Sequence, residues 1–114
     1  MTSGYWKRWA AAVSFVAAVS GCGAEKGEKV TKNLLARGGK LFSVHCVGCH
    51  PAGENRIYPQ KSLHAVDLRA NGITTADDIV AVIRNPGRGM KKFDKSTLPD
   101  ADARAIAQYI LATF

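Results

Sequence analysis

The sequence contains few of the residues that cross-link small proteins or bind metals in them. Its 114 residues include three cysteines, three histidines and two methionines, one of which is Met1. The longest apolar run has about a dozen residues, whereas a helix needs ~20 to span a bilayer. We find no internal repeat, no low-complexity segment and no strand-like alternation. We therefore expect one small domain at most, with its chemistry confined to a few positions.

The apolar run belongs to the pattern of an export signal. Lys7 and Arg8 precede it, the run extends from Trp9 to Val19, and small residues follow. A membrane-spanning segment is the less favoured interpretation, because the run is short. We predict that residues 1–21 are a signal peptide and that the mature protein lies outside the cytoplasm.

The signal ends in "VSGC", residues 19–22, which resembles the lipobox of bacterial lipoproteins. In that motif the cysteine becomes the lipidated first residue, and its acyl chains hold a soluble domain at a membrane surface. An ordinary signal peptide followed by an incidental cysteine is the alternative. Lipidation of Cys22 would also explain the odd number of cysteines, because an exported protein otherwise leaves one unpaired.

A polar segment separates the signal from the part of the chain that can fold. The stretch "GAEKGEKVTK" is charged and has no apolar period, so residues 22–32 are predicted to be a lipidated cysteine and a flexible tether. Residues 33–114 are predicted to form the domain. A chain of this size buries a modest core and is often stabilised by a cofactor, a metal or a disulfide.

Apolar residues in the domain recur at helical spacing. The strongest case is "TTADDIVAVIRNPG", in which Thr75 is a good N-cap, acids follow it, and Asn-Pro-Gly ends the pattern. We predict an all-α fold of three to five short helices, with helical segments at 33–46, 62–72, 74–87 and 98–114. Two long loops, 51–61 and 85–97, are the segments expected to wrap a ligand or perform a function.

The stretch "CVGCH" offers the most specific chemistry. It is a C-x-x-C-H motif formed by Cys46, Cys49 and His50, and this motif is typical of c-type haem attachment. Two cysteines at this spacing can reach the two vinyl groups of one porphyrin and form thioethers. The next residue then projects under the ring, where the imidazole of His50 can bind iron.

Other sites could use the same residues. A zinc site could take Cys46, Cys49, His50 and His64, but the chain has no second C-x-x-C and the intervening loop is irregular. A thioredoxin-like redox pair would require a βαβ pattern, which the sequence lacks. The motif could also occur by chance in a folded core. Export favours haem attachment, because c-type cytochromes mature outside the cytoplasm.

The second axial position of such an iron would need another ligand. Met90 is the one methionine besides Met1, and it lies in the Gly-rich loop "NPGRGMKKF" rather than on a helical stripe. We predict that Met90 is this ligand, with His64 as the alternative and a gap-filling core methionine as the structural explanation. His45 is predicted to be a surface residue that points away from the porphyrin.

Together these residues identify the chain as resembling the class I cytochromes c, of the small bacterial and algal monohaem type, from Leu34 to Phe114. Gly38 and Phe42 precede the motif at the spacing of the family's G-x-x-x-F-x-x-x-C-x-x-C-H. The resemblance implies a cytochrome c fold wrapped round one covalently bound haem c. It also implies that the glycine lets the first helix cross the last closely, and that Phe42 packs on Tyr109.

The resemblance further implies residues that support the haem. A carbonyl in the loop after the motif is expected to accept a hydrogen bond from the ligand histidine, and Pro59 is the candidate. Lys61 and Asn55 are candidates to face a propionate, although Asn55 is better explained as an exposed loop residue. Pro51, directly after the motif, departs from the usual pattern.

The function implied is electron carriage rather than enzymatic catalysis, since two filled axial positions exclude small ligands. We expect a monomer on the periplasmic side of a bacterial membrane, anchored there by lipid, with acidic redox partners and no nucleic acid. Basic residues around Met90 are candidates to steer those partners, with a solvated surface as the alternative: Arg84, Arg88, Lys91, Lys92 and Lys95. A haem sensor or small-ligand-binding lipoprotein with a labile sixth site is the alternative function.

Overall fold

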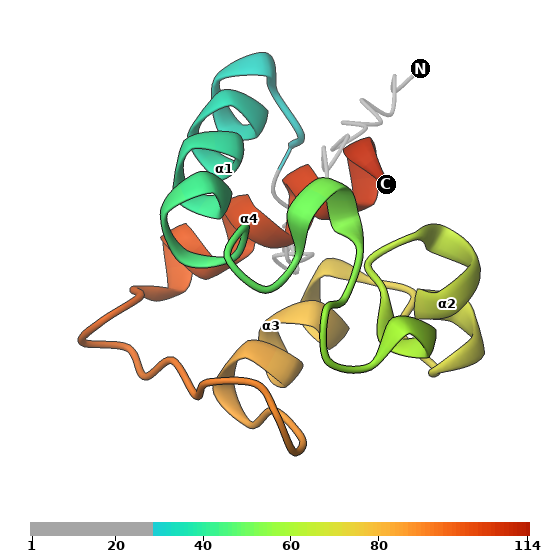
Figure 1. Cartoon of the computed structure of the whole chain (residues 1–114). Coiled ribbons are helices and arrows are strands. Elements are labelled where there is room, and N and C mark those ends of the chain that lie inside the picture. The colour runs from blue at the N-terminus through green and yellow to red at the C-terminus, as the bar shows by residue number, and fades with distance from the viewer. Residues whose placement is uncertain (1–28) are drawn as a thin grey trace, which may run out of the picture.

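The computed structural model describes residues 29–114, which form helices and short 3-10 turns (Figure 1). Within that range there is no strand, so the predicted all-α class is confirmed. The predicted signal peptide and Cys22 lie outside the described residues. The elements are α1 (Lys32–His45), η1 (Pro51–Gly53), η2 (Pro59–Lys61), α2 (Ala65–Ala70), α3 (Ala76–Arg84) and α4 (Asp100–Thr113).

The helix ends follow from local side-chain chemistry. The Thr31 hydroxyl accepts a hydrogen bond from the amide of Leu34 at 3.1 Å, so α1 begins at Lys32, inside the range predicted as tether. Thr75 is the N-cap of α3, as predicted, and it forms a reciprocal capping box with Asp78. The helix predicted over 62–72 is shorter, because η2 and an extended Ser62 precede α2.

The frame of the fold is the crossing of α1 over α4 (Figure 1). Gly38 is buried there, and a Cβ on it would overlap the carbonyl oxygen of Ala105. The rings of Phe42 and Tyr109 lie 5.4 Å apart between centroids, and Phe114 packs 5.5 Å from Phe42. Both contacts implied by the family resemblance are present, and they fix how the end of α1 lies against α4.

A core of apolar side chains joins α3 and α4 to this frame. Leu98 and Ile106 are its largest fully buried side chains, and Ile79 and Ile83 of α3 are also buried. The chain between α3 and α4 runs as an extended loop along one side, drawn in orange in Figure 1. None of the described helices is long and apolar enough to cross a membrane.

Candidate functional site

The C-terminal end of α1 turns directly into the C-x-x-C-H motif. The amide of Cys46 still bonds to Phe42 O at 2.9 Å, and the amides of Cys49 and His50 then bond back to Cys46 O at 3.1 and 2.9 Å. These bonds fold residues 46–50 into one tight turn. The motif is thereby held as a unit at the end of the helix that α4 supports.

A cavity of about 410 Å³ lies beside this turn. This volume is in the range of roughly 300–1,000 Å³ that is usual for ligand pockets. The cavity is lined by both motif cysteines, His50 and Met90, together with apolar side chains from α2, α3, α4 and the loops between helices. The apolar residues include Ile57, Leu63, Leu68, Ile73, Ile79, Val82, Ile83, Ile106 and Ile110. The structure therefore brings the motif and the loop methionine, forty residues apart, to one apolar cavity.

His50 is buried, with an exposed fraction of 8%, and its ring is oriented by a backbone group. Its Nδ1 lies 2.9 Å from the carbonyl oxygen of Glu54. Because a carbonyl only accepts, Nδ1 carries the proton and Nε2 keeps its lone pair for a metal. The assignment of this role to Pro59 is wrong: the tight turn η1 returns the chain to His50 within four residues, and Pro59 lies farther along, in η2.

His64 does not join the motif. Its Nε2 lies 3.4 Å from the Glu54 carboxylate, and its ring packs edge-on against Phe114 at 6.0 Å. Among residues 29–114 no group of three or more His, Cys, Asp or Glu side chains is arranged to hold a metal ion. The zinc site considered from the sequence therefore does not gain its fourth ligand from His64.

The thiol of Cys46 is poorly suited to disulfide exchange. Burial, and to a lesser extent the neighbouring Cys49, raises the pKa of the Cys46 thiol to about 11. The thiolate is the reactive form, and redox-active cysteines have lowered pKa values. A raised pKa leaves Cys46 as a neutral thiol, which disfavours the thioredoxin-like alternative.

Met90 is half-buried against the core and lies in the loop between α3 and α4. Gly89, before it, has a φ of +91°, a conformation that side chains with a Cβ rarely adopt. A Cβ there would also lie 2.7 Å from the ring of Tyr58. The loop therefore approaches the 51–61 segment closely at the residue that precedes the methionine.

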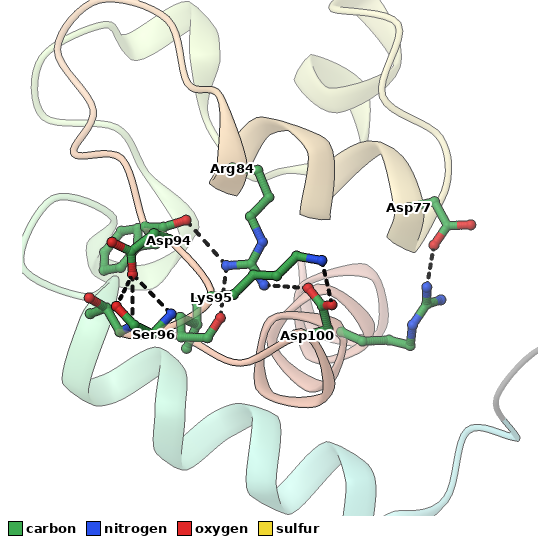
Figure 2. Close-up of polar contacts among 10 residues, drawn as sticks. Asp77, Arg84, Asp94, Lys95, Ser96 and Asp100 are labelled. Atoms are coloured by element: carbon green, nitrogen blue, oxygen red, sulfur yellow. Dashed lines mark hydrogen bonds and ion pairs between the residues drawn. The ribbon is translucent and has the colours of Figure 1, made fainter.

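The basic residues of this loop do not act alike. Arg84 is half-buried and bonds to the loop carbonyls of Phe93 and Leu98 and to Asp100, and Lys95 also pairs with Asp100 at 3.1 Å (Figure 2). Arg84 therefore binds within the fold, in contrast to the steering role predicted for it, whereas Lys95 keeps an exposed side chain in a surface ion pair. The side chains of Arg88, Lys91 and Lys92 are exposed, and the first and second of them border the cavity.

Asn55 and Lys61, the two residues predicted to face a haem propionate, make different contacts. The side-chain amide of Asn55 donates to Lys61 O at 3.0 Å, and its oxygen accepts from the amides of Ile57 and Tyr58. Asn55 therefore organises its loop, although it also borders the cavity. Lys61 lines the cavity with its ammonium group 5.3 Å from the centroid of the Tyr58 ring.

Sequence reasoning missed three side chains of the cavity wall. His45 was predicted to face away, but it is half-buried, lines the cavity and packs edge-on against Phe93 at 5.8 Å. Its place at the end of α1, where the helix gives way to the motif turn, directs it inward. Tyr58 and Phe93 also line the cavity. Their aromatic character within the two long loops was the available signal for both.

The residues present fit a covalently attached haem. The cavity is apolar, both thiols reach it, and the tautomer of His50 leaves one ring nitrogen for iron. The thioether sulfur of Met90 belongs to the same cavity, and methionine with histidine is a known axial pair of haem iron.

Comparisons with known proteins agree with this fit. Residues 33–110 match the family model described as cytochrome c oxidase, cbb3-type, subunit III. Cytochrome c6 of the alga Cyanidium caldarium is 35% identical over 101 residues, which cover 88% of this chain and 91% of that protein. Cytochrome c6 of Cyanidioschyzon merolae is 38% identical over 78 residues, which cover 68% of this chain and 73% of that protein.

Solved structures show the same fold. OmcF, the outer membrane cytochrome F of Geobacter sulfurreducens, is 49% identical, with a TM-score of 0.66 over 68% of this chain and 98% of that one. Cytochrome c6C from Synechococcus sp. PCC 7002 is 28% identical, with a TM-score of 0.63 over 67% of this chain and 92% of that one. The chain therefore belongs to the class I cytochrome c family, whose members are electron carriers with one covalently attached haem c and are not enzymes.

Proposed function

We propose that this protein is an exported, lipid-tethered cytochrome that passes single electrons between partner proteins, with His50 and Met90 as the axial ligands of its iron. The observation that carries the proposal is that both motif cysteines, His50 and Met90 line the same apolar cavity. A bound haem c supplies an iron that alternates between the ferric and ferrous states. Transfer is outer-sphere, so no substrate has to bind to the metal.

The protein side chains set how that iron behaves. The bond from His50 Nδ1 to the Glu54 carbonyl fixes the ring and raises the basicity of Nε2. The soft thioether of Met90 favours ferrous iron and raises the potential. With both axial positions filled by the chain, small ligands are excluded. Cys46 and Cys49 hold the porphyrin through thioethers, and Lys61 at the cavity rim supplies positive charge for a propionate.

Exposed cations in the loop around Met90 favour binding to a partner protein with an acidic surface. Arg88, Lys91 and Lys92 are all exposed, and the formal charge of +7 on the full chain is still +5 without Lys7 and Arg8 of the proposed signal peptide. Opposite charges on a partner would accelerate encounter, and salt would screen that attraction. We expect the rate of transfer to an acidic partner to fall as ionic strength rises. A rate indifferent to salt would argue against steering.

Export and lipid attachment are proposed from the N-terminal sequence. Residues 1–21 have the pattern of a signal peptide and Cys22 ends a lipobox-like motif. The outer-membrane name of the similar Geobacter cytochrome supports a location at a bacterial membrane. Lipidation at Cys22 would hold the protein in the membrane fraction, and Cys22→Ser should release it. Equal retention of both forms would exclude this anchor.

The ligation proposal is tested by the absorption spectrum of the ferric protein. A methionine–iron bond gives a weak far-red band, which we expect in the intact protein. Met90→Leu keeps the side-chain volume and should abolish the band and open the sixth position to added imidazole. Met90→His, the matched control, should also lack the band but resist imidazole, because it supplies a ligand itself. Absence of the band from the intact protein would instead favour a haem sensor with a labile site.

A further inference from the structure

The methionine loop, residues 85–99, needs to be held in place if Met90 is to occupy a fixed position. The loop leaves α3 at Arg84 and returns at Asp100, the first residue of α4, without a helix or strand of its own. Ordering each residue of such a segment costs roughly 1–2 kcal/mol of backbone entropy. Contacts with the rest of the fold therefore decide where the methionine lies.

Arg84 connects the second half of the loop to the helices on either side of it. Its Nη1 donates to Phe93 O at 3.2 Å and to Leu98 O at 2.7 Å. Its Nη2 lies 2.7 Å from the carboxylate of Asp100. One guanidinium thus connects the last turn of α3, two carbonyls of the loop and the first turn of α4, as Figure 2 shows.

The contacts at Phe93 limit how far the nearby Met90 can move. The amide of Phe93 donates to Ile83 O at 3.1 Å, while its carbonyl accepts from Arg84. Its side chain is buried and lies against His45 in the cavity wall. Phe93 follows Met90 by only three residues, so a shift at Phe93 would move the methionine.

Lysine cannot reproduce the contacts that this guanidinium makes. Arginine presents its donors in a rigid planar fork, whereas lysine offers a single flexible ammonium. The side chain of Arg84 is 19% exposed, so its hydrogen bonds are largely shielded from water. Within residues 29–114 its Nε is the one buried side-chain nitrogen or oxygen without a hydrogen-bond partner.

We propose that Arg84 is a positioning residue that holds the methionine loop so that Met90 reaches the iron. The inference rests on the proposed role of Met90 as axial ligand. Loss of the guanidinium leaves two loop carbonyls without their charged donor and frees the loop between Phe93 and Leu98. Met90 then leaves the iron more often, and an added ligand competes with it more successfully.

The test compares two arginines that each bridge α3 and α4. Arg84→Met keeps most of the aliphatic stem and removes the donors. Arg104→Gln, the matched control, removes a 2.6 Å ion pair to Asp77 on α3, drawn in the same view (Figure 2). Three quantities are measured on the haem-loaded ferric proteins. These are the melting temperature of the far-red band, the melting temperature of the helical circular dichroism, and the apparent dissociation constant for imidazole.

Arg84→Met should lose the far-red band at a lower temperature than the helical signal. It should bind imidazole about tenfold more tightly than the intact protein, a change equivalent to about 1.4 kcal/mol. Arg104→Gln should change neither the gap between the two melting temperatures nor the imidazole affinity. If Arg84→Met does not fold, Arg84→Lys should show the same changes to a smaller degree.

Two results would overturn the inference. In the first, the intact protein has the far-red band, but the folded Arg84 variant (Arg84→Met or Arg84→Lys) does not behave as expected. Either it keeps the wild-type imidazole affinity, or its two melting temperatures fall together. Arg84 would then be a general stabilising residue, and ligation by Met90 would stand. In the second, the intact protein has no far-red band. That result removes the proposed ligation itself and the positioning role with it.

Discussion

The histidine side and the methionine side of the cavity are held by different kinds of contact. His50 is fixed by neighbours in sequence, because its amide bonds to Cys46 and its ring to Glu54, each four residues away. Met90 depends on contacts between separate segments, one of which is remote in sequence. Tyr58 packs on Gly89, and Arg84 binds the loop that returns to α4.

This difference indicates which side opens first. The histidine turn is continuous with α1, and α1 is packed on α4, so loosening it requires loss of the frame. The methionine loop has many exposed residues and no regular backbone ladder, which are features of regions that open locally. For the proposed pair of axial ligands, we therefore expect Met90 to leave the iron in partial openings during which His50 stays bound.

The largest effect should come from a change that affects both sides together. In Gly38→Ala the new methyl group would overlap the carbonyl oxygen of Ala105, and only separation of α1 from α4 relieves this. We expect a loss of about 2–3 kcal/mol, since overpacking outweighs the gain in helix propensity. Denaturant unfolding of the haem-loaded protein measures it, and the far-red band and the helical signal should be lost together.

The neighbouring glycine provides the control. In Gly39→Ala the nearest atom to the new methyl group is an edge carbon of the Tyr109 ring at 3.0 Å, and a side chain can move where a backbone cannot. Gly39→Ala should therefore be close to wild type in stability. Equal destabilisation by the two substitutions would mean that the close helix crossing is not the cause.

Gly89→Ala should have a smaller effect on stability, confined to the methionine side of the cavity. The φ of +91° and the ring of Tyr58, 2.7 Å from the new Cβ, both oppose the substitution. Strain of this kind costs about 1–3 kcal/mol. We expect the loop to relieve it by moving, so the far-red band should melt earlier while the helical signal changes little.

The matched change on the histidine side is Gly48→Ala. No atom lies within 4 Å of a Cβ placed at Gly48, which is exposed between the two motif cysteines. This variant should keep the wild-type melting temperature of the band. If Gly89→Ala lowered both melting temperatures equally, the two sides would not open independently, and the contrast between them would fail.

The same contrast explains how much could be predicted from the sequence. The helices and the Thr75 cap depend on near neighbours, and their positions were predicted to within a few residues. The crossing at Gly38 was also predicted, because the family resemblance supplied the long-range partner that local patterns lack. Met90 was identified as a candidate from its scarcity and its loop, without any indication of what would hold it.

The errors lie where an irregular turn, a helix end or a loop contact decides the position of a group. Glu54 rather than Pro59 provides the carbonyl to His50, because the η1 turn reverses the chain sooner than a long loop suggested. Arg84 was predicted to be a docking charge, yet its partners are carbonyls that only the folded loop brings near. His45 lines the cavity because of how α1 ends. Periodicity carries no information about any of these.

The smallest expected effect on the methionine side is a pH-dependent one at Asp94. Its carboxylate accepts hydrogen bonds from the hydroxyl and amide of Ser96 at 2.7 and 3.0 Å and from the amide of Thr97 at 2.8 Å. The Ser96 hydroxyl, followed by the Thr97 amide, lowers the pKa of Asp94 to about 2. An unfolded aspartate has a pKa of ~3.9. The ionised carboxylate therefore favours the ordered loop above pH ~4, and this contribution is lost as pH falls through about 2.

Asp94→Asn keeps an acceptor oxygen but cannot titrate. At neutral pH we expect its far-red band to melt slightly below that of the intact protein, by less than in Gly89→Ala. Between pH 4 and pH 2 the two melting temperatures should converge, because the intact protein loses the advantage of its charge. Asp78→Asn, in the α3 cap, is the control: the pKa of Asp78 is also lowered, chiefly by the amide of Thr74. That change should affect the helical signal as much as the band. A difference between Asp94→Asn and the intact protein that stays constant across this range would mean that the turn at Asp94 does not hold the loop through its charge.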